Sequence, residues 1–542
     1  MDKQQKIPVK GDDLRKTNIY SYGIGHFMND LCASCWFFFL SYFLIEIVNI
    51  GEYNTGYVML AGQVADAIAT PLVGIFSDKT NTKIGKRTPW YIGGTVLVVF
   101  SFTLIFVKIL PADSSQTLTL IYYITFASIF NIGWAAVQVS HMALVPSISI
   151  NKKNKDLMIR IRTGFTFLAQ TVALCISFFY FWLIKNKIVQ YELLAGTCVL
   201  FGICTSVIFF VLCKEAALSK NIPLYLTRMR DSLRAHIISS NINDKQENDN
   251  TDSIKMISGG EIQQVSTTNV EEKEMVWSDW LKKSEFYAYI FVYMFVRLSI
   301  NVTQSVIPFY MENILNYKKP EGGGTPVEIS IVLLISTLGS IMNSLLIQEW
   351  IEKRIKKSKN RRLIMLAMSA FLVTLGCIPM YFLNGTFRYP IYILAFIFGI
   401  GFSQGLSTVS SLTNDVVGSN GAQGAFVYGA YSFTDKLSCG IVLALFLPYA
   451  KREATVLKYS MPIFPPASLI CAFVIVLFRG FFKKNIDKEK HMRLLDEKDQ
   501  IANKNYNSII EDPRFTFISN TNYSSLESEQ KKNRENIDDL LY

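Results

Sequence analysis

The sequence predicts an all-α polytopic membrane protein with twelve transmembrane helices in two pseudo-symmetric six-helix halves. The chain of 542 residues is 50% hydrophobic and only 18% charged, with a mean hydropathy of +0.26, whereas soluble proteins carry about 25% charged residues. Long apolar runs recur along it, and basic residues gather in alternate connections between them. Because the backbone has no hydrogen-bond partner in lipid, each run is expected to be helical.

Twelve runs are long enough to cross a bilayer, whose hydrocarbon core of about 30 Å needs roughly 20 helical residues. In chain order they are expected near residues 20–48, 56–76, 90–109, 119–147, 157–184, 192–213, 285–311, 327–348, 363–383, 389–414, 422–449 and 460–481.

Polar segments divide the chain into five expected parts. The stretch 214–284 contains "NINDKQENDNTDS" and, like the tail at 483–542, has a composition typical of disorder. The parts are therefore a cytosolic N-terminus at 1–19, a helical half at 20–213, a cytosolic linker at 214–284, a second half at 285–482 and a cytosolic tail at 483–542. Two related halves are typical of transporters with a binding site at mid-membrane.

The basic residues follow the expected topology. They gather at 79–87, 152–162 and 352–362, whereas the connections 49–55 and 111–117 contain no Lys or Arg. The positive-inside rule places the basic set in the cytosol, together with both termini. This explains the net charge of +11 without nucleic acid as a partner. No cleavable signal peptide is expected, because 1–16 is polar and the first apolar run is full length.

The sequence contains no recognisable enzyme, cofactor or metal motif. No dinucleotide, P-loop, nucleophile-elbow or zinc-protease pattern is present, so transport would depend on a gradient. All nine cysteines fall within expected spans, and the Cys32–Cys35 spacing is attributed to helix packing.

The connection "GIFSDKTNTKIGKRTPW" at 74–90 is expected to be a cytosolic gating loop. Asp78 is expected either to cap a helix end or to pair with Arg87 across that face, with Lys86 beside them. Gly74, Gly93 and Gly94 are expected to allow close helix approach. Such a loop can hold the two halves in one state and release them in another.

Two carboxylates inside the first half are candidate cavity residues. A charge at the bilayer centre costs roughly 2.5–3.5 kcal/mol on insertion scales, so it usually marks a pathway. Asp30 and Asp66 are expected to accept a cation, a proton or a substrate ammonium, with capping or an interhelical bond as the alternative for Asp30. The neighbours of Asp66 in sequence offer it no partner.

Several other polar residues in the spans are candidates. His26 and Asp66 could relay a proton, although a histidine hydrogen-bonded between helices is the commoner case. Gln138 and His141 share a helical face, and Arg162 is attributed to the basic loop. In the seventh span, Arg297, Asn301 and Gln304 form a polar stripe, with Arg297 a clamp for a substrate carboxylate.

The loop ending in Pro89-Trp90 resembles that of the glycoside–pentoside–hexuronide cation symporter branch of the major facilitator superfamily. Five motifs resemble animal members of the superfamily that import cysteine into lysosomes and melanosomes and affect pigmentation. They are "SYGIGHFMNDLCASCWF" (21–37), "GQVADAIATPLVG" (62–74), "NIGWAAVQVSHMALVP" (131–146), "YMFVRLSINVTQS" (293–305) and "GAFVYGAYSFTDK" (424–436).

The resemblance implies a twelve-helix symporter-like fold, alternating access and cysteine as a small-molecule substrate. In the symporters a lysine at the place of Lys436 faces the cavity, and Tyr428 extends that face. Thr70 stands where the sodium-coupled sugar carriers have a second carboxylate, which puts sodium coupling in doubt and suits a proton better. Uniport is equally compatible.

Two rival functions remain open at this point. One is a cation-coupled sugar symporter, for which a carboxylate at position 70 is expected. The other is a non-transporting organelle scaffold, which has no need to bear charges in its spans. The tail motifs "YNSI" (506–509) and "YSSL" (523–526), with Leu540-Leu541, fit recognition by endosomal sorting adaptors. Asn384 lies in a glycosylation sequon whose loop is short.

Overall fold

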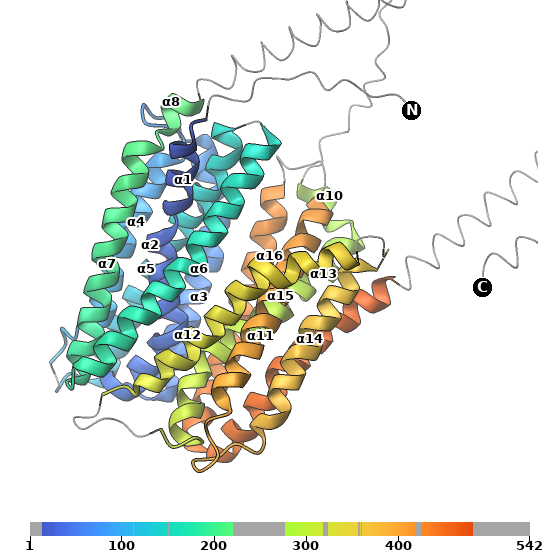
Figure 1. Cartoon of the computed structure of the whole chain (residues 1–542). Helices are drawn as coiled ribbons and strands as arrows, with labels where there is room; N and C mark the ends of the chain where they lie inside the picture. Colours follow the sequence, from blue (N-terminus) through green and yellow to red (C-terminus); the bar gives the residue numbers. More distant parts are fainter. Residues whose placement is uncertain are drawn as a thin grey trace, which may run out of the picture. The chain divides into compact units, whose positions relative to one another are not determined.

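The computed structural model describes residues 14–111, 113–149, 151–219, 277–317, 324–355, 358, 360–417 and 424–480. These residues form helices and connections, with one isolated β-bridge between Thr82 and Gly85 (Figure 1). Most of the expected linker, the tail and its sorting motifs lie outside them. The ends of the linker are helical, in α8 (Glu215–Ser219) and α10 (Trp277–Leu281).

Within the described residues, eleven helices are long and apolar enough to cross a membrane. Their order and approximate ends agree with eleven of the twelve expected spans. They comprise α3 (Glu52–Lys79), α4 (Thr88–Phe106), α5 (Gln116–Ile148), α6 (Lys152–Leu183), α7 (Lys187–Leu212), α11 (Ser284–Asn313), α12 (Val327–Met342) continued by the π-helical Asn343–Ile347 and α13 (Gln348–Arg354), α14 (Arg361–Met380), α15 (Ile391–Val417), α16 (Gly424–Arg452) and the helix Ala454–Gly480.

The remaining span, expected at 20–48, is an interrupted helix. It consists of α1 (Lys16–Ile24), α2 (Phe27–Cys35) and two π-helical segments, Trp36–Leu40 and Phe43–Val48. The chain turns at Gly25, whose carbonyl accepts a hydrogen bond from Tyr91 of α4. Interruptions of this kind are frequent at functional sites, and this one places His26 directly before α2.

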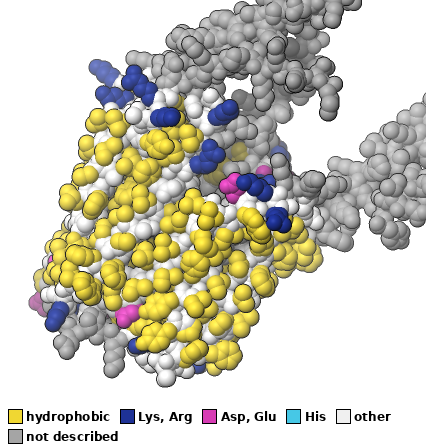
Figure 2. All heavy atoms as spheres, in the orientation of Figure 1, with side chains coloured by type: hydrophobic (Ala, Val, Ile, Leu, Met, Phe, Trp, Pro, Cys, Tyr) yellow, Lys and Arg dark blue, Asp and Glu magenta, His cyan; other side chains and the backbone are white. Residues whose placement is uncertain are grey.

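Apolar side chains cover the surface of the helical part (Figure 2). Trp182, Leu445 and Phe371 are each at least 65% exposed, which suits contact with lipid rather than water. Lysine and arginine gather mainly at the end where α1 and α8 lie, the end of the basic connections (Figures 1 and 2).

Small residues allow several helices to pack at close range, as in other membrane bundles. A Cβ on Gly399 of α15 would lie 1.9 Å from the Ser336 carbonyl oxygen of α12, and Gly94 and Gly133 bring α4 against α5. Gly74 and Gly93 have no other element within 4 Å of such a Cβ, so only Gly94 of the three loop glycines serves the expected packing.

The two halves touch at the end opposite the basic connections. The hydroxyl of Tyr42 donates to Glu312 at 2.8 Å, and Ser177 bonds Ser330 at 2.9 Å. Tyr191 and Thr325 bond at 2.9 Å beside them. These contacts close that end between the halves.

At the basic end, Arg87 pairs with Asp78 as expected and also donates to Ser77. Glu215, which no sequence pattern singled out, accepts hydrogen bonds from the backbone N–H groups of Lys86, Arg87 and Thr88. Its carboxylate therefore caps the N-terminus of α4.

We expect Gly399→Ala to lower the free energy of unfolding by about 1–3 kcal/mol, because the added methyl must push α12 and α15 apart. Thermal unfolding of the purified protein in detergent checks this. Gly196→Ala is the matched control, because nothing lies within 4 Å of its Cβ position. Equal unfolding temperatures for the two variants would contradict the close packing.

Candidate functional site

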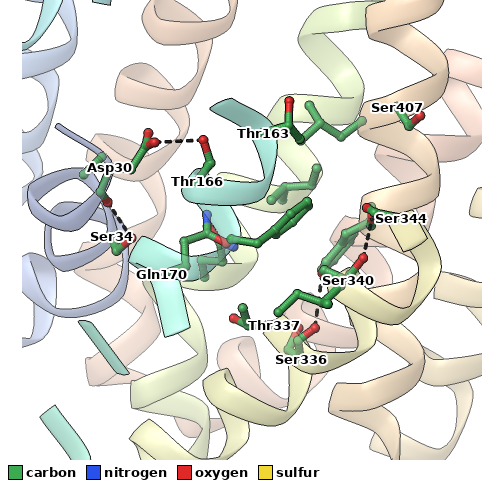
Figure 3. Close-up of a pocket in the computed structure, with 18 of the residues that line it drawn as sticks. Asp30, Ser34, Thr163, Thr166, Gln170, Ser336, Thr337, Ser340, Ser344 and Ser407 are labelled. Carbon is green, nitrogen blue, oxygen red and sulfur yellow. Dashed lines mark hydrogen bonds between the residues drawn. The ribbon is translucent and has the colours of Figure 1, made fainter. Parts of the chain in front are cut away.

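A cavity of about 1180 Å³ lies between the two halves. It reaches the basic end, where Arg160, Glu349, Glu352 and Asn414 line it. Figure 3 shows Asp30 and Thr166 on one side and Ser336, Ser340 and Ser344 of the α12 segment on the other. The cavity is therefore open toward the basic end, while the opposite end is closed by the contacts between the halves.

An ion pair across the halves lies at the depth of this cavity. Lys436 of α16, which lines the cavity, pairs with Asp66 of α3, which is fully buried behind it. Thr70 donates to Asp66 at 3.0 Å and accepts from Lys436 at 3.4 Å. Trp134 lies 5.5 Å from the lysine ammonium, within cation–π range. Asp66 thus finds in the other half the partner that its sequence neighbours lack.

A second ion pair lies within the C-terminal half. The Nε of Arg297 donates to Asp435 at 3.0 Å, and the amide of Asn301 donates to the same carboxylate at 3.5 Å. Asp435 and Lys436 are neighbours on α16, where successive side chains diverge by about 100°. One therefore reaches α11 and the other α3. Arg297, expected as a clamp for substrate, has an internal partner in this structure.

Removing one member of such a buried pair leaves an uncompensated charge, which typically costs about 3–5 kcal/mol. The two pairs together contain two acids and two bases, so they neutralise one another. The two ion pairs together connect α3, α11 and α16.

A cluster of charged and titratable side chains lies in the N-terminal half. The Nδ1 of His26 is 2.9 Å from Asp30, whose other carboxylate oxygen accepts a hydrogen bond from Thr166 at 2.8 Å. An Arg162 nitrogen lies 3.2 Å from Nε2 of the same imidazole. His26, Asp30, Arg162 and Thr166 all line the cavity. Arg162, attributed to the basic loop from sequence, is thus a cavity residue because α6 extends unbroken through it.

The other candidates divide into two sets. Gln138, Asn301 and Gln304 line the cavity as expected. His141 does not line it: its imidazole is fully buried and stacked on Tyr22, with ring centroids 4.2 Å apart. Tyr428 does not line it either, and its hydroxyl donates to Asn414, which does.

Sequence reasoning missed a row of serines on α12 and the segment after it. Ser336, Ser340 and Ser344 recur every four residues, a helical spacing that a search for charged residues passes over. Ser344 bonds Ser403 of α15 at 2.9 Å. In the part of the chain that the structure describes, no group of three His, Cys, Asp or Glu side chains is placed to hold a metal ion.

Comparison with known proteins agrees with this architecture. Residues 21–229 match the family model described as MFS/sugar transport protein. The xylose transporter XylE from E. coli shares the fold, with a TM-score of 0.56 at 10% identity over 85% of this chain and 99% of that one. An uncharacterized symporter of Synechocystis is 29% identical over 163 residues, 29% of this chain and 30% of that protein. The chain is a multi-pass secondary transporter with the major facilitator fold, and not an enzyme.

A longer similarity points to one group of relatives. The human major facilitator superfamily domain-containing protein 12 is 28% identical over 435 residues, covering 78% of this chain and 83% of that protein. The mouse protein of the same name is 27% identical over 430 residues. These similarities confirm the resemblance that the five sequence motifs indicated.

We expect Asp66→Asn to lower the free energy of unfolding by about 3–5 kcal/mol, because it leaves Lys436 buried without a countercharge. Adding Lys436→Gln should restore part of that loss, so the double variant loses less stability than the two single variants lose in sum. Unfolding of the four proteins in detergent measures the coupling.

The exposed pair Arg362–Asp415 is the control for this cycle. Neutralising either member should change stability by no more than about 1 kcal/mol. Additive losses at Asp66 and Lys436 would mean that the two charges do not stabilise each other.

Proposed function

We propose that this protein imports cysteine from the cytosol into lysosomes or melanosome-like organelles by alternating access. The sequence resemblance supplies the substrate and the compartment. The positive-inside rule then makes the open, basic end of the cavity cytosolic, with both termini on that side. A role in pigmentation, and sorting by endosomal adaptors that read the tail, would follow from the same resemblance.

The single observation that carries the proposal is the pairing of opposite charges on the cavity wall. Asp30 and Arg162 line the same side of the cavity, next to the His26 imidazole that contacts both. A zwitterionic amino acid carries an ammonium and a carboxylate a few ångströms apart, and these two side chains have the complementary charges. The cavity volume also admits solutes larger than an amino acid. The charges of Asp30 and Arg162, and not the size of the cavity, therefore favour an amino acid.

In this mechanism Asp30, Arg162 and the two ion pairs have separate roles. Asp30 would receive the substrate ammonium and Arg162 its carboxylate. The pair Asp66–Lys436 would hold the halves in the cytosol-facing state, and Arg297–Asp435 would fix α16 against α11. Exchange to the other state requires the contacts at Tyr42 and Ser177 to part and the basic end to close.

A cation-coupled sugar symporter is the second candidate, favoured by the description of the family model. Gln138, Gln170 and Asn301 line the cavity and could bond sugar hydroxyls, and Trp134 offers an apolar face. The hydroxyl of Thr70, in place of a carboxylate, supplies one hard oxygen fewer for sodium.

Labelled-cysteine uptake into proteoliposomes containing the purified protein tests the proposal directly. We expect uptake above protein-free vesicles, and a loss of about tenfold or more in Asp30→Asn, because one charge-assisted contact contributes roughly 1.5–3 kcal/mol.

Asp113→Asn, in an exposed connection, is the matched control and should transport normally. Labelled xylose and melibiose are offered to the same vesicles. Sugar uptake with no cysteine uptake from intact protein would replace the first candidate with the second.

A further inference from the structure

The imidazole of His26 lies between an acid, a base and an amide. Nδ1 faces the Asp30 carboxylate at 2.9 Å, and Nε2 faces the Asn29 amide nitrogen at 3.3 Å. One Arg162 guanidinium nitrogen lies 3.2 Å from Nε2 and 3.4 Å from Nδ1. With the amide as placed, Nε2 accepts from Asn29 and Nδ1 donates to Asp30, which corresponds to a neutral ring.

Charged and titratable groups on several elements surround His26. Asp30 lies on its own helix and Arg162 on α6. From α5, the His141 ring lies 5.4 Å away, and its Nε2 donates to the Tyr22 carbonyl of α1 at 2.7 Å. Beyond it lies Tyr91 of α4, and α7 presents the apolar Phe209. Asp30 thus favours a positive His26, and Arg162 opposes it.

A proton added to Nε2 would face two donors, and only one of them has an alternative. The side-chain oxygen Oδ1 of Asn29 is buried and accepts no hydrogen bond among the described residues. Turning this amide over therefore gives the new N–H an acceptor. Arg162 cannot become an acceptor in this way, because a guanidinium has only donors and keeps its positive charge. It would remain 3.2 Å from a positive ring and be repelled by it. It already lines the cavity and can move toward it.

We propose that His26 is a proton-binding site of this transporter, and that a proton there displaces Arg162 into the cavity, where its guanidinium binds the carboxylate of the substrate. The carboxylate part rests on the proposed function, whereas the proton switch does not. Since a bound carboxylate offsets the charge of Arg162, it in turn favours the proton on His26. By reciprocity the two ligands strengthen each other's binding.

The proton switch is tested without any substrate. Phenylglyoxal labels arginine, and mass spectrometry of the full-length protein in lipid nanodiscs gives the labelling rates of Arg162 and Arg354. Arg354 is exposed and does not line the cavity, so the ratio of the two rates removes the reagent's own pH dependence.

Between pH 8 and pH 5.5 we expect this ratio to rise about threefold or more in the wild type, because an ordinary imidazole titrates within this range. His26→Gln should show a constant ratio, since an amide does not titrate there. His141→Gln, the same change on the neighbouring ring, should keep the rise. A constant ratio in the wild type, or a rise that survives His26→Gln, would overturn the switch.

The carboxylate part is tested at pH 5.5 with cysteine against cysteamine, which has the same thiol and ammonium but no carboxylate. Both thiols consume reagent, and the ratio to Arg354 corrects for this. Cysteine alone should slow the labelling of Arg162. Cysteine uptake without such protection would overturn Arg162 as the carboxylate site. Absence of both uptake and protection would overturn the proposed function, and the pH series alone would then decide the proton switch.

Discussion

The ion pair between Asp66 and Lys436 connects the two halves of the protein at the depth of the cavity. Asp66 belongs to α3 and Lys436 to α16, and both are almost entirely removed from solvent. An unpaired charge there would be strongly destabilising, so each half supplies the countercharge for the other. Because the residue before Lys436 holds Arg297, one helix connects α3 with α11. A rotation of α16 about its axis would strain both pairs together.

The charged side chains on the N-terminal half of the cavity wall are organised differently. His26, Asp30 and Arg162 all belong to the N-terminal half, and their contacts do not cross the cavity. A change of charge there alters the wall without parting the halves. The structure thus separates the ion pair that joins the halves from a set of charges that lines the cavity within one half. The interruption before α2 makes this possible, since it puts a histidine at a break in the first span.

Apolar runs and basic connections were enough to predict the order of the spans, because lipid permits few alternatives to a full-length helix. The broken first span could not be predicted from the length of its run. Asp30 and Asp66 were identified as candidates because charges in lipid are rare, and Lys436 because the resembling symporters have a cavity-facing lysine at this place. Arg162 was missed because a lysine- and arginine-rich stretch precedes it, and Glu215 because its partners are backbone groups. Pairing between distant helices, as for Asp66, depends on packing that no local pattern records.

The charges at membrane depth also determine how the carrier responds to voltage. The acids Asp30, Asp66 and Asp435 are matched by the bases Arg162, Arg297 and Lys436, and His26 is neutral as placed. A membrane potential acts on a net charge, at about 2.3 kcal/mol per elementary charge for each 100 mV. The empty carrier therefore returns across the membrane without electrical work from these groups. If His26 carries the proposed proton while a zwitterion is bound, the loaded form moves a single positive charge, and only that half of the cycle is electrogenic.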